Sequence, residues 1–421
     1  MNPATVTPLQ SWAPDRARRL EHTGPHTTAA MEFTLGWRCD NARHTDCLVA
    51  DKLALGRDLL PPALEAELMG KPAGHSAAAA FAPGDLLPAA AEHDVLTVPA
   101  TAFNRRLRRH RYVEPHAGRF YPRAFIAGVR GIVPEDLRPF RVGQLDPEFV
   151  IDLNHPLAGR PLALSACVLD IWSAGDEPGG CCSDIAQLVT AAGPGMQARW
   201  RNRPTDFFAD LPFTRMADEP DAGFYAQARL VDHIDRTATA QIESLYGRLI
   251  PTGARVLDLM SSWKSHLPPA TASTEVVGLG MNAEELAANP LLGERLVRDL
   301  NLEPRLPFED QRFDAVVCTV SVEYLTRPFE VFAEVRRVLR PGGRFIVTFS
   351  NRWFPPKVIQ AWQEAHEFER PGLVLEYFLR AGGFRDLETF SLRGLPRPAD
   401  DKYADRLAHA DPVYAVWGNR A

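Results

Sequence analysis

The chain has 421 residues, of which 47 are basic and 53 are acidic, giving a formal net charge of −6. This length corresponds to two or three domains, and an apolar content of 45% excludes a wholly disordered chain. The acidic balance disfavours a nucleic-acid binder held by bulk positive charge. No apolar run is long enough to cross a bilayer, and the N-terminus lacks a signal-peptide pattern, so we expect a cytoplasmic protein.

The charge is distributed unevenly along the chain. Residues 1–175 carry 19 basic and 19 acidic side chains, so the remainder carries the whole charge of −6. This asymmetry predicts two bodies of different character.

The first body is expected to be rich in β-structure. Residues 1–30 are rich in Pro, Thr and Ala without periodicity and are expected to form a flexible arm. Residues 31–173 hold short β-rich pieces between Gly and Pro residues, together with one short helix at Pro62–Met69. The expected strands are Phe33–Trp37, Cys47–Ala50, Val95–Val98, Phe149–Leu153 and Leu162–Trp172.

Residues 174–222 are expected to form a connector draped over a neighbouring domain. The segment contains Gly179-Gly180 followed by Cys181-Cys182, the only clustered thiols in the chain. Adjacent thiols in a Gly-rich loop could bind a soft metal or carry redox chemistry. No second cysteine pair supports a zinc site, so we predict no metal and keep these two residues as weak candidates.

The second body, residues 223–421, is predicted to be an α/β domain. Continuous apolar strands alternate with amphipathic helices, which is typical of a parallel sheet covered on both faces. The strongest helical period lies in Leu230–Leu249. Further helices are expected at Ala283–Asn289, Phe329–Leu339, Pro356–His366 and Val374–Ala381, and strands at Arg255–Met260, Val276–Gly280, Phe313–Thr319, Phe345–Ser350, Leu387–Leu392 and Val413–Trp417.

Four stretches of the second body resemble class I S-adenosylmethionine-dependent methyltransferases. They read ARVLDLMSSW, VVGLGMN, VRDLNLEPRLPFEDQRFDAVVCTVSVEYL and PFEVFAEVRRVLRPGGRFIVTFSN. The resemblance implies a Rossmann-like fold with S-adenosylmethionine bound at the carboxyl ends of the strands. It places Asp258 near the methionine amine, and Asp299 with Leu300 at the adenine. The other positions implied to bind the cofactor are Ser261, Ser262, Trp263, Gly278, Gly280, Asn282 and Ser321.

Two positions depart from the family pattern. The loop after the first strand, Leu259–Trp263, has no glycine. Its serine hydroxyls could replace backbone contacts to the cofactor, or the loop could fill the cleft. Gly280 stands where an acidic residue usually holds the ribose, and Asn282 is a neutral substitute nearby. Pro341-Gly342-Gly343 is expected to form a tight turn with a positive φ.

Residues 31–173 resemble SlyD-type FKBP peptidyl-prolyl isomerases with an inserted flap. The resembling segments are LLPPALEAELMGKPAGH, VLTVPATAF and FVIDLNHPLAGRPLALSACVLDIW. The resemblance implies a peptide-binding cup, and Leu60, Leu87 and Leu164 fall on its lining positions. Leu87 and Leu164 replace aromatic residues, which favours peptide binding over fast isomerisation.

The leading hypothesis is a methyltransferase joined to an FKBP-like peptide-binding domain. Its acceptor is a small molecule or a protein, with no nucleic-acid or membrane partner, and the sequence leaves the oligomeric state open. The alternatives are a non-catalytic or chaperone-like binding protein with a degenerate methyltransferase fold, and an active prolyl isomerase. Candidates for a catalytic base or positioning group are Ser321, Glu323, Tyr324 and His266.

Overall fold

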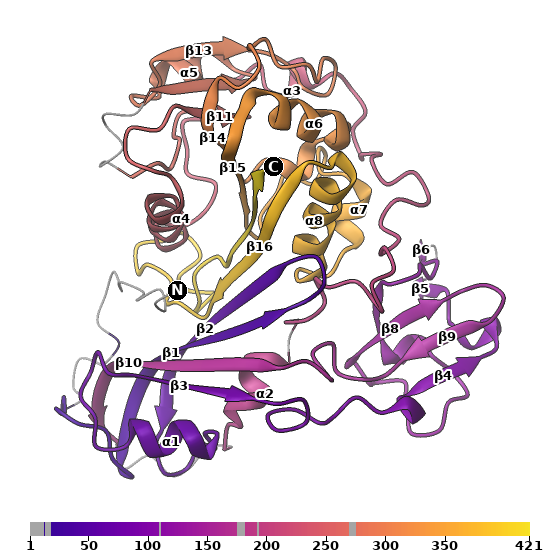
Figure 1. Ribbon diagram of the computed structural model, residues 1–421, viewed down its shortest axis with the longest axis vertical. Coiled ribbons are helices and arrows are strands. Elements are labelled where there is room, and N and C mark those ends of the chain that lie inside the picture. Colours follow the sequence, from indigo (N-terminus) through magenta and orange to yellow (C-terminus); the bar gives the residue numbers. More distant parts are fainter. Residues whose placement is uncertain (1–11, 13–17, 109–110, 175–181, 192, 269–274) are drawn as a thin grey trace.

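A single sheet of eleven strands runs through most of the molecule (Figure 1). The computed structural model describes all residues except 1–11, 13–17, 109–110, 175–181, 192 and 269–274. The strand order is β13-β12-β11-β14-β15-β17-β16-β2-β1-β10-β3. Strands from both halves of the chain therefore belong to one hydrogen-bonded layer, although the sequence predicts two separate bodies.

The C-terminal half of the sheet has the predicted α/β architecture. Five strands are parallel to one another, and β17 and β16 complete the half-sheet as an antiparallel pair. The strands are β11 (Val256–Leu259), β12 (Val276–Gly280), β13 (Glu294–Val297), β14 (Phe313–Thr319), β15 (Leu339–Phe349), β16 (Phe384–Arg393) and β17 (Val413–Arg420).

Helices cover both faces of this half-sheet. One face packs on α6 (Pro328–Val338) and α8 (Glu369–Ala381), and the other on α4 (Arg236–Leu249) and α5 (Ala283–Ala288). Alternate residues of one strand serve the two faces, as Leu257 and Val256 show. Gly342 has the predicted positive φ (+77°), but it lies inside β15 and not in a separate turn, at an irregularity in the pairing with β14.

The N-terminal half of the sheet is antiparallel and carries its own core. Its strands are β1 (Thr27–Arg38), β2 (Arg43–Ala54), β3 (Ser76–Phe81) and β10 (Leu162–Ser173), with α1 (Pro62–Leu68) and α2 (Ile185–Thr190) packed against them. We call residues 18–95 and 153–173 the front body. Strand β1 begins at Thr27, inside the segment expected to be an arm, because Ala29 and Ala30 are fully buried.

A smaller antiparallel sheet, the flap sheet, lies beside the front body (Figure 1). Its order is β4-β9-β8-β7, and a pair of short strands extends from it. The bounds are β4 (Val95–Val98), β7 (Phe120–Pro122), β8 (Pro139–Gln144), β9 (Phe149–Asp152), β5 (Arg106–Arg108) and β6 (Arg111–Tyr112). Its own aromatic core centres on Phe103, Tyr121 and Phe140.

The two halves of the large sheet meet where β16 runs parallel to β2. Buried Asp46 lies at this junction and accepts hydrogen bonds from Trp37 Nε1 (2.8 Å) and Ser391 Oγ (2.8 Å). Gln197 Nε2 of the connector also donates to Asp46, at 3.2 Å. The carboxylate of Asp46 thus joins the front body, the connector and the C-terminal half.

Several predicted helices begin later or are shorter than the sequence suggests. Helix α4 starts after Asp235, whose side chain accepts from Ala238 N, so Leu230 and Val231 lie outside it and are exposed. Helix α7 covers only Gln360–Glu364 of the longer segment predicted there. The remaining short elements are α3 (Asp221–Phe224), η1 (Glu92–Asp94), η2 (Ala100–Ala102), η3 (Arg123–Phe125) and η5 (Val322–Tyr324). Within the described residues, every helix is too short or too polar to traverse a bilayer.

Candidate functional site

A cavity lies at the carboxyl ends of the parallel strands, where open α/β sheets bind ligands. The space between its lining atoms, including the open mouth of the cavity, has a volume of about 790 Å³. The lining residues are Asp221, Tyr225, Arg229, His233, Met260, Ser261, Ser262, Leu279, Gly280, Met281, Glu285, Arg298, Asp299, Leu300, Asn301, Val320, Ser321, Tyr324 and Phe354.

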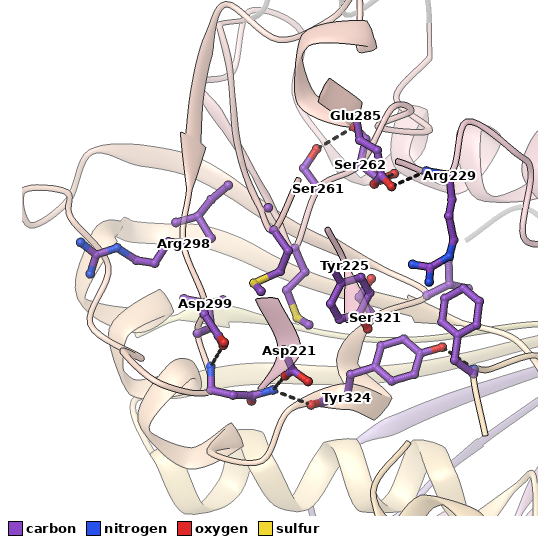
Figure 2. A pocket seen from close by; sticks show the side chains of 18 of the residues that line it. Asp221, Tyr225, Arg229, Ser261, Ser262, Glu285, Arg298, Asp299, Ser321 and Tyr324 are labelled. Atoms are coloured by element: carbon purple, nitrogen blue, oxygen red, sulfur yellow. Dashed lines mark hydrogen bonds between the residues drawn. The ribbon is translucent and has the colours of Figure 1, made fainter. Parts of the chain in front are cut away.

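Asp299 and Leu300 follow β13 and line one end of the cavity, as predicted. The Oδ1 atom of Asp299 accepts from Asn301 N (2.8 Å) and Leu302 N (3.3 Å). Its Oδ2 atom is buried and has no hydrogen-bond partner among the described residues. An unpartnered carboxylate oxygen beside a buried leucine fits an adenine ring, because the oxygen can accept the exocyclic amine. Figure 2 shows Asp299 on the opposite side of the cavity from Arg229. The guanidinium of Arg298 points away from the centre of the cavity.

The glycine-free loop after β11 lines the cavity without filling it. Met260 adopts φ +59°, and Ser261 N donates to Leu279 O (2.8 Å), so the loop passes directly over the end of β12. A Cβ atom on Gly280 would lie 2.1 Å from Ser261 O. This position therefore needs glycine, and no acidic side chain fits where the family usually has one. Instead Glu285 lines the cavity, and its Oε2 accepts from Ser262 Oγ (2.7 Å).

Asp258 lies behind this loop and faces a second, adjoining cavity of about 490 Å³. It is 2% exposed, and Ser261 Oγ donates to its Oδ2 at 2.5 Å. Burial raises the pKa of Asp258 to about 7, against the hydrogen bonds from Ser261 and Ser265. His266 and Trp263 line the same second cavity but not the larger one. Burial lowers the pKa of His266 to about 4.

Residues 221–235, here called the strap, form a wall that the sequence analysis did not identify. Its side chains Asp221, Tyr225, Arg229 and His233 all line the main cavity. Asn282 Nδ2 donates to the carbonyls of Tyr225 (2.9 Å) and Ala226 (3.1 Å). The backbone N of Arg229 donates to Glu285 Oε1 at 2.7 Å (Figure 2). The strap is thus held over the ends of the strands by side chains of the β12–α5 region.

Asp221 anchors the beginning of the strap. Its carboxylate accepts from Arg215 (2.8 Å) and Asn301 Nδ2 (2.9 Å), and it lies 3.0 Å from Lys357 Nζ. Lys357 is 1% exposed and also donates to Glu219 O. These contacts hold the pKa of Asp221 below its usual value although burial opposes them. A charged Asp221 at this position therefore fixes one edge of the cavity.

The residues after β14 have different surroundings. Val320 and Ser321 line both cavities, and Tyr324 lines the main one, where its hydroxyl accepts from Phe354 N (2.9 Å). Glu323 lines neither cavity. It is 1% exposed, its Oε2 has no partner, and burial raises its pKa to about 8.

Of the other cofactor-binding candidates, Asn282 and Gly278 do not line the main cavity. The Oδ1 atom of Asn282 caps α5 by accepting from Glu284 N and Glu285 N, and its amide holds the strap. A Cβ on Gly278 would lie 2.4 Å from Leu292, so this glycine makes room for the side chain of Leu292 in the loop between α5 and β13. The Asn-Ala-Glu-Glu run from Asn282 is a capping pattern and could have revealed this role.

In the front body, Leu60, Leu87 and Leu164 belong to one core and are each less than 10% exposed. They share this core with Leu64 and Leu68 of α1. In the connector, Cys182 is exposed and donates to Arg57 O (2.9 Å), whereas Cys181 lies outside the described residues. The described residues contain no group of three or more His, Cys, Asp or Glu side chains arranged to hold a metal.

Comparisons with known proteins agree with the geometry of the C-terminal half. Residues 264–347 match a family described as a methyltransferase domain. This part of the chain is therefore similar to methyltransferase domains. S-adenosylmethionine is the methyl donor of such domains, and the residues at Asp299 and Leu300 fit its adenine.

Two curated relatives align with part of the chain. A demethylmenaquinone methyltransferase of Renibacterium salmoninarum is 34% identical over 110 residues, covering 25% of this chain and 45% of that protein. Methyltransferase GfsG of Streptomyces halstedii is 27% identical over 141 residues, covering 31% and 50%. The chain thus spans about half the length of these relatives. A possible histamine N-methyltransferase from Thermotoga maritima is a solved structure with 13% identity and a TM-score of 0.32, covering 45% of this chain and 90% of that one.

Proposed function

We propose that the protein is an S-adenosylmethionine-dependent methyltransferase whose acceptor is a small planar molecule with an acidic or phenolic group. The observation that carries this proposal is the division of the cavity into two unlike ends. Asp299 and Leu300 lie at one end, and aromatic side chains with Arg229 and His233 lie at the other.

The second end has the properties of a site for a planar anion. Tyr225, Tyr324 and Phe354 line it, and the guanidinium of Arg229 lies 5.5 Å from the Phe354 ring. Arg229 donates to the carbonyl of Phe224 and forms no salt bridge with a described carboxylate. A flat ring can stack on these aromatic faces while its oxyanion meets the guanidinium. The quinone-related name of the first relative agrees with such an acceptor.

Methyl transfer requires a close, desolvated and correctly oriented acceptor. When bound, S-adenosylmethionine supplies an electrophilic methyl group. His233 lies where the two cavities adjoin, and neither of its ring nitrogens has a hydrogen-bond partner among the described residues. Burial lowers the pKa of His233, which keeps the imidazole neutral and able to accept a proton from the acceptor.

Calorimetric titration of the full chain with S-adenosylmethionine and S-adenosylhomocysteine tests the proposal. Asp299→Asn retains Oδ1 but puts an amide donor at the unpartnered oxygen, so we expect binding to weaken about tenfold or more. Asp405→Asn, an exposed and distant change of the same chemistry, should leave the affinity unchanged.

Absence of binding by the wild-type chain would contradict the proposal and favour the alternative of a non-catalytic protein with a methyltransferase fold. Equal affinities of Asp299→Asn and the wild type would remove the adenine assignment. The FKBP-like role of the front body stays a prediction. Its three candidate residues are packed in a core. Cis–trans isomerisation of a proline-containing peptide no faster than the uncatalysed reaction would reject the isomerase activity.

A further inference from the structure

A third cavity lies between the front body, the flap sheet and the connector. Its lining residues are far in sequence from the strand ends of the methyltransferase half. It encloses about 930 Å³, including its mouth, and shares no lining residue with the main cavity. Four arginines from three segments line it: Arg141 of β8, Arg160 after β9, and Arg199 and Arg201 of the connector. We call it the arginine cavity.

Among the described residues, no carboxylate forms a salt bridge with Arg141, Arg160 or Arg201, although Asp152 and Glu369 attract Arg141 from a greater distance. Both oxygens of Asp152 already accept hydrogen bonds, from Asn154 N (2.9 Å) and from Trp200 Nε1 (2.9 Å). Glu92 is exposed and forms no salt bridge with a described arginine. Only Arg199 has a carboxylate partner, Glu376 of α8, at 2.7 and 2.8 Å.

Arg141 and Arg160 are cations without an ion-pair partner among the described residues. Arg141 is 6% exposed and donates to the carbonyls of Gly118 (2.8 Å) and Ala198. Burial lowers its pKa to about 10, so it stays charged at neutral pH. Arg160 donates to Arg38 O (3.0 Å), and its Nε is buried with no partner. Because no carboxylate touches either guanidinium, an anion bound in direct contact would stabilise these charges further.

Aromatic rings fix the guanidinium planes before any ligand arrives. Arg141 lies 4.3 Å over Phe120, Arg160 lies 5.4 Å over Trp37, and Arg201 lies 4.6 Å over Trp200. Stacked guanidinium groups lose little freedom on binding, and their fork of donors matches the oxygens of a carboxylate or a phosphate.

We propose that the arginine cavity binds a small organic oxyanion with carboxylate or phosphate groups. The ligand neutralises Arg141 and Arg160, with the buried Nε of Arg160 as one donor. Its binding bridges the front body, the flap sheet and the connector, and through Arg199 and Glu376 it contacts the methyltransferase half. The proposal is independent of the methyl-transfer function, because the two cavities have no residue in common.

Titration of the full chain with citrate and with inorganic phosphate, at constant ionic strength set by sodium chloride, tests this inference. We expect saturable binding and a raised melting temperature with at least one probe, and the comparison tells carboxylate from phosphate recognition. Arg160→Gln should weaken binding about tenfold, the value of one charge-assisted hydrogen bond. The matched control Arg130→Gln removes an exposed arginine of the flap region outside the cavity and should bind as the wild type does.

The inference is overturned if neither probe binds the wild type at concentrations up to about 10 mM. A dissociation constant above this value is too weak for a specific site. It is also overturned if both variants weaken binding equally, since that indicates general charge attraction. If Arg160→Gln does not fold, as judged by circular dichroism, Arg201→Gln replaces it, because Arg201 is exposed on the opposite wall. Unchanged affinity in the folded variant contradicts the site.

Discussion

Two buried carboxylic acids lie beneath the main cavity and make the stability of the protein depend on pH. Burial raises the pKa of Asp258 from 3.8 to about 7 and that of Glu323 from 4.5 to about 8. Between the unfolded and folded pKa values, the folded chain binds more protons than the unfolded chain. The free energy of unfolding therefore falls as the pH rises through this window and levels off above it.

Asp258→Asn should reduce this pH dependence. The amide keeps an oxygen acceptor for Ser261 but cannot ionise, so its folded state has no charge to bury. Between pH 5 and pH 7 the wild type should lose about 2 kcal/mol that the variant retains. Urea denaturation at both pH values, with Glu323 unchanged in each protein, measures the difference. If the variant shows the same decrease as the wild type and the exposed control Asp405→Asn, the Asp258 carboxyl does not titrate in this window.

The sequence predicted several single residues of the cavity but not what all of them do. Asp299, Leu300, Ser261 and Ser321 line it because strand ends in a parallel sheet converge, which follows from the strand pattern alone. Asn282 does not line it, because its side chain is used by a helix cap and by the strap. A motif gives the place of a residue in the chain, whereas the competing hydrogen bonds decide where its side chain points.

At the scale of elements, the strap is the feature that sequence periodicity concealed. Apolar residues at helical spacing continue from Val231 into α4, yet the helix begins only after Asp235. The carboxylate of Asp235 also accepts from Asp411 N and lies 3.3 Å from Arg397, so this position is fixed by partners far along the chain. Local spacing cannot reveal such partners.

Asn282→Asp should loosen the strap selectively. The aspartate oxygen still caps α5, but the two hydrogen bonds to Tyr225 O and Ala226 O are lost and replaced by repulsion. We expect trypsin to cleave after Arg229 several times faster, because cleavage needs local opening of the backbone. Mass spectrometry of the fragments measures the rate. Asn104→Asp in the flap region is the matched control, and equal rates in all three proteins would show that Asn282 does not hold the strap.

At the scale of the whole molecule, the two halves form one hydrogen-bonded unit. The uneven charge led us to predict two bodies, but β2 and β16, about 345 residues apart, pair through backbone groups. Backbone pairing of this kind leaves little trace in composition. Arg43–Glu388 adds an ion pair across the same junction, and Arg119–Glu369 joins the flap region to α8 of the C-terminal half.

The wild-type chain should therefore unfold in a single calorimetric transition that includes both halves. Asp46→Ala leaves Trp37 Nε1, Ser391 Oγ and Gln197 without their buried acceptor, so the transition should shift down as a whole, by about 3 kcal/mol or more. Asp51→Ala changes an exposed residue of the same strand and should have little effect. Two resolved transitions, of which Asp46→Ala moves only one, would show that the halves unfold separately.

The junction also determines which strand edges face the solvent. Residues 388–393 of β16 lie against residues 43–48 of β2, so the last strand of the C-terminal half presents no open edge there. The outermost strands of the large sheet are β13, with four residues, and β3, with six. Long open edges recruit strands from other molecules, whereas short ones are poor templates. The front body therefore protects the methyltransferase half from edge-to-edge aggregation, whatever ligand either cavity holds.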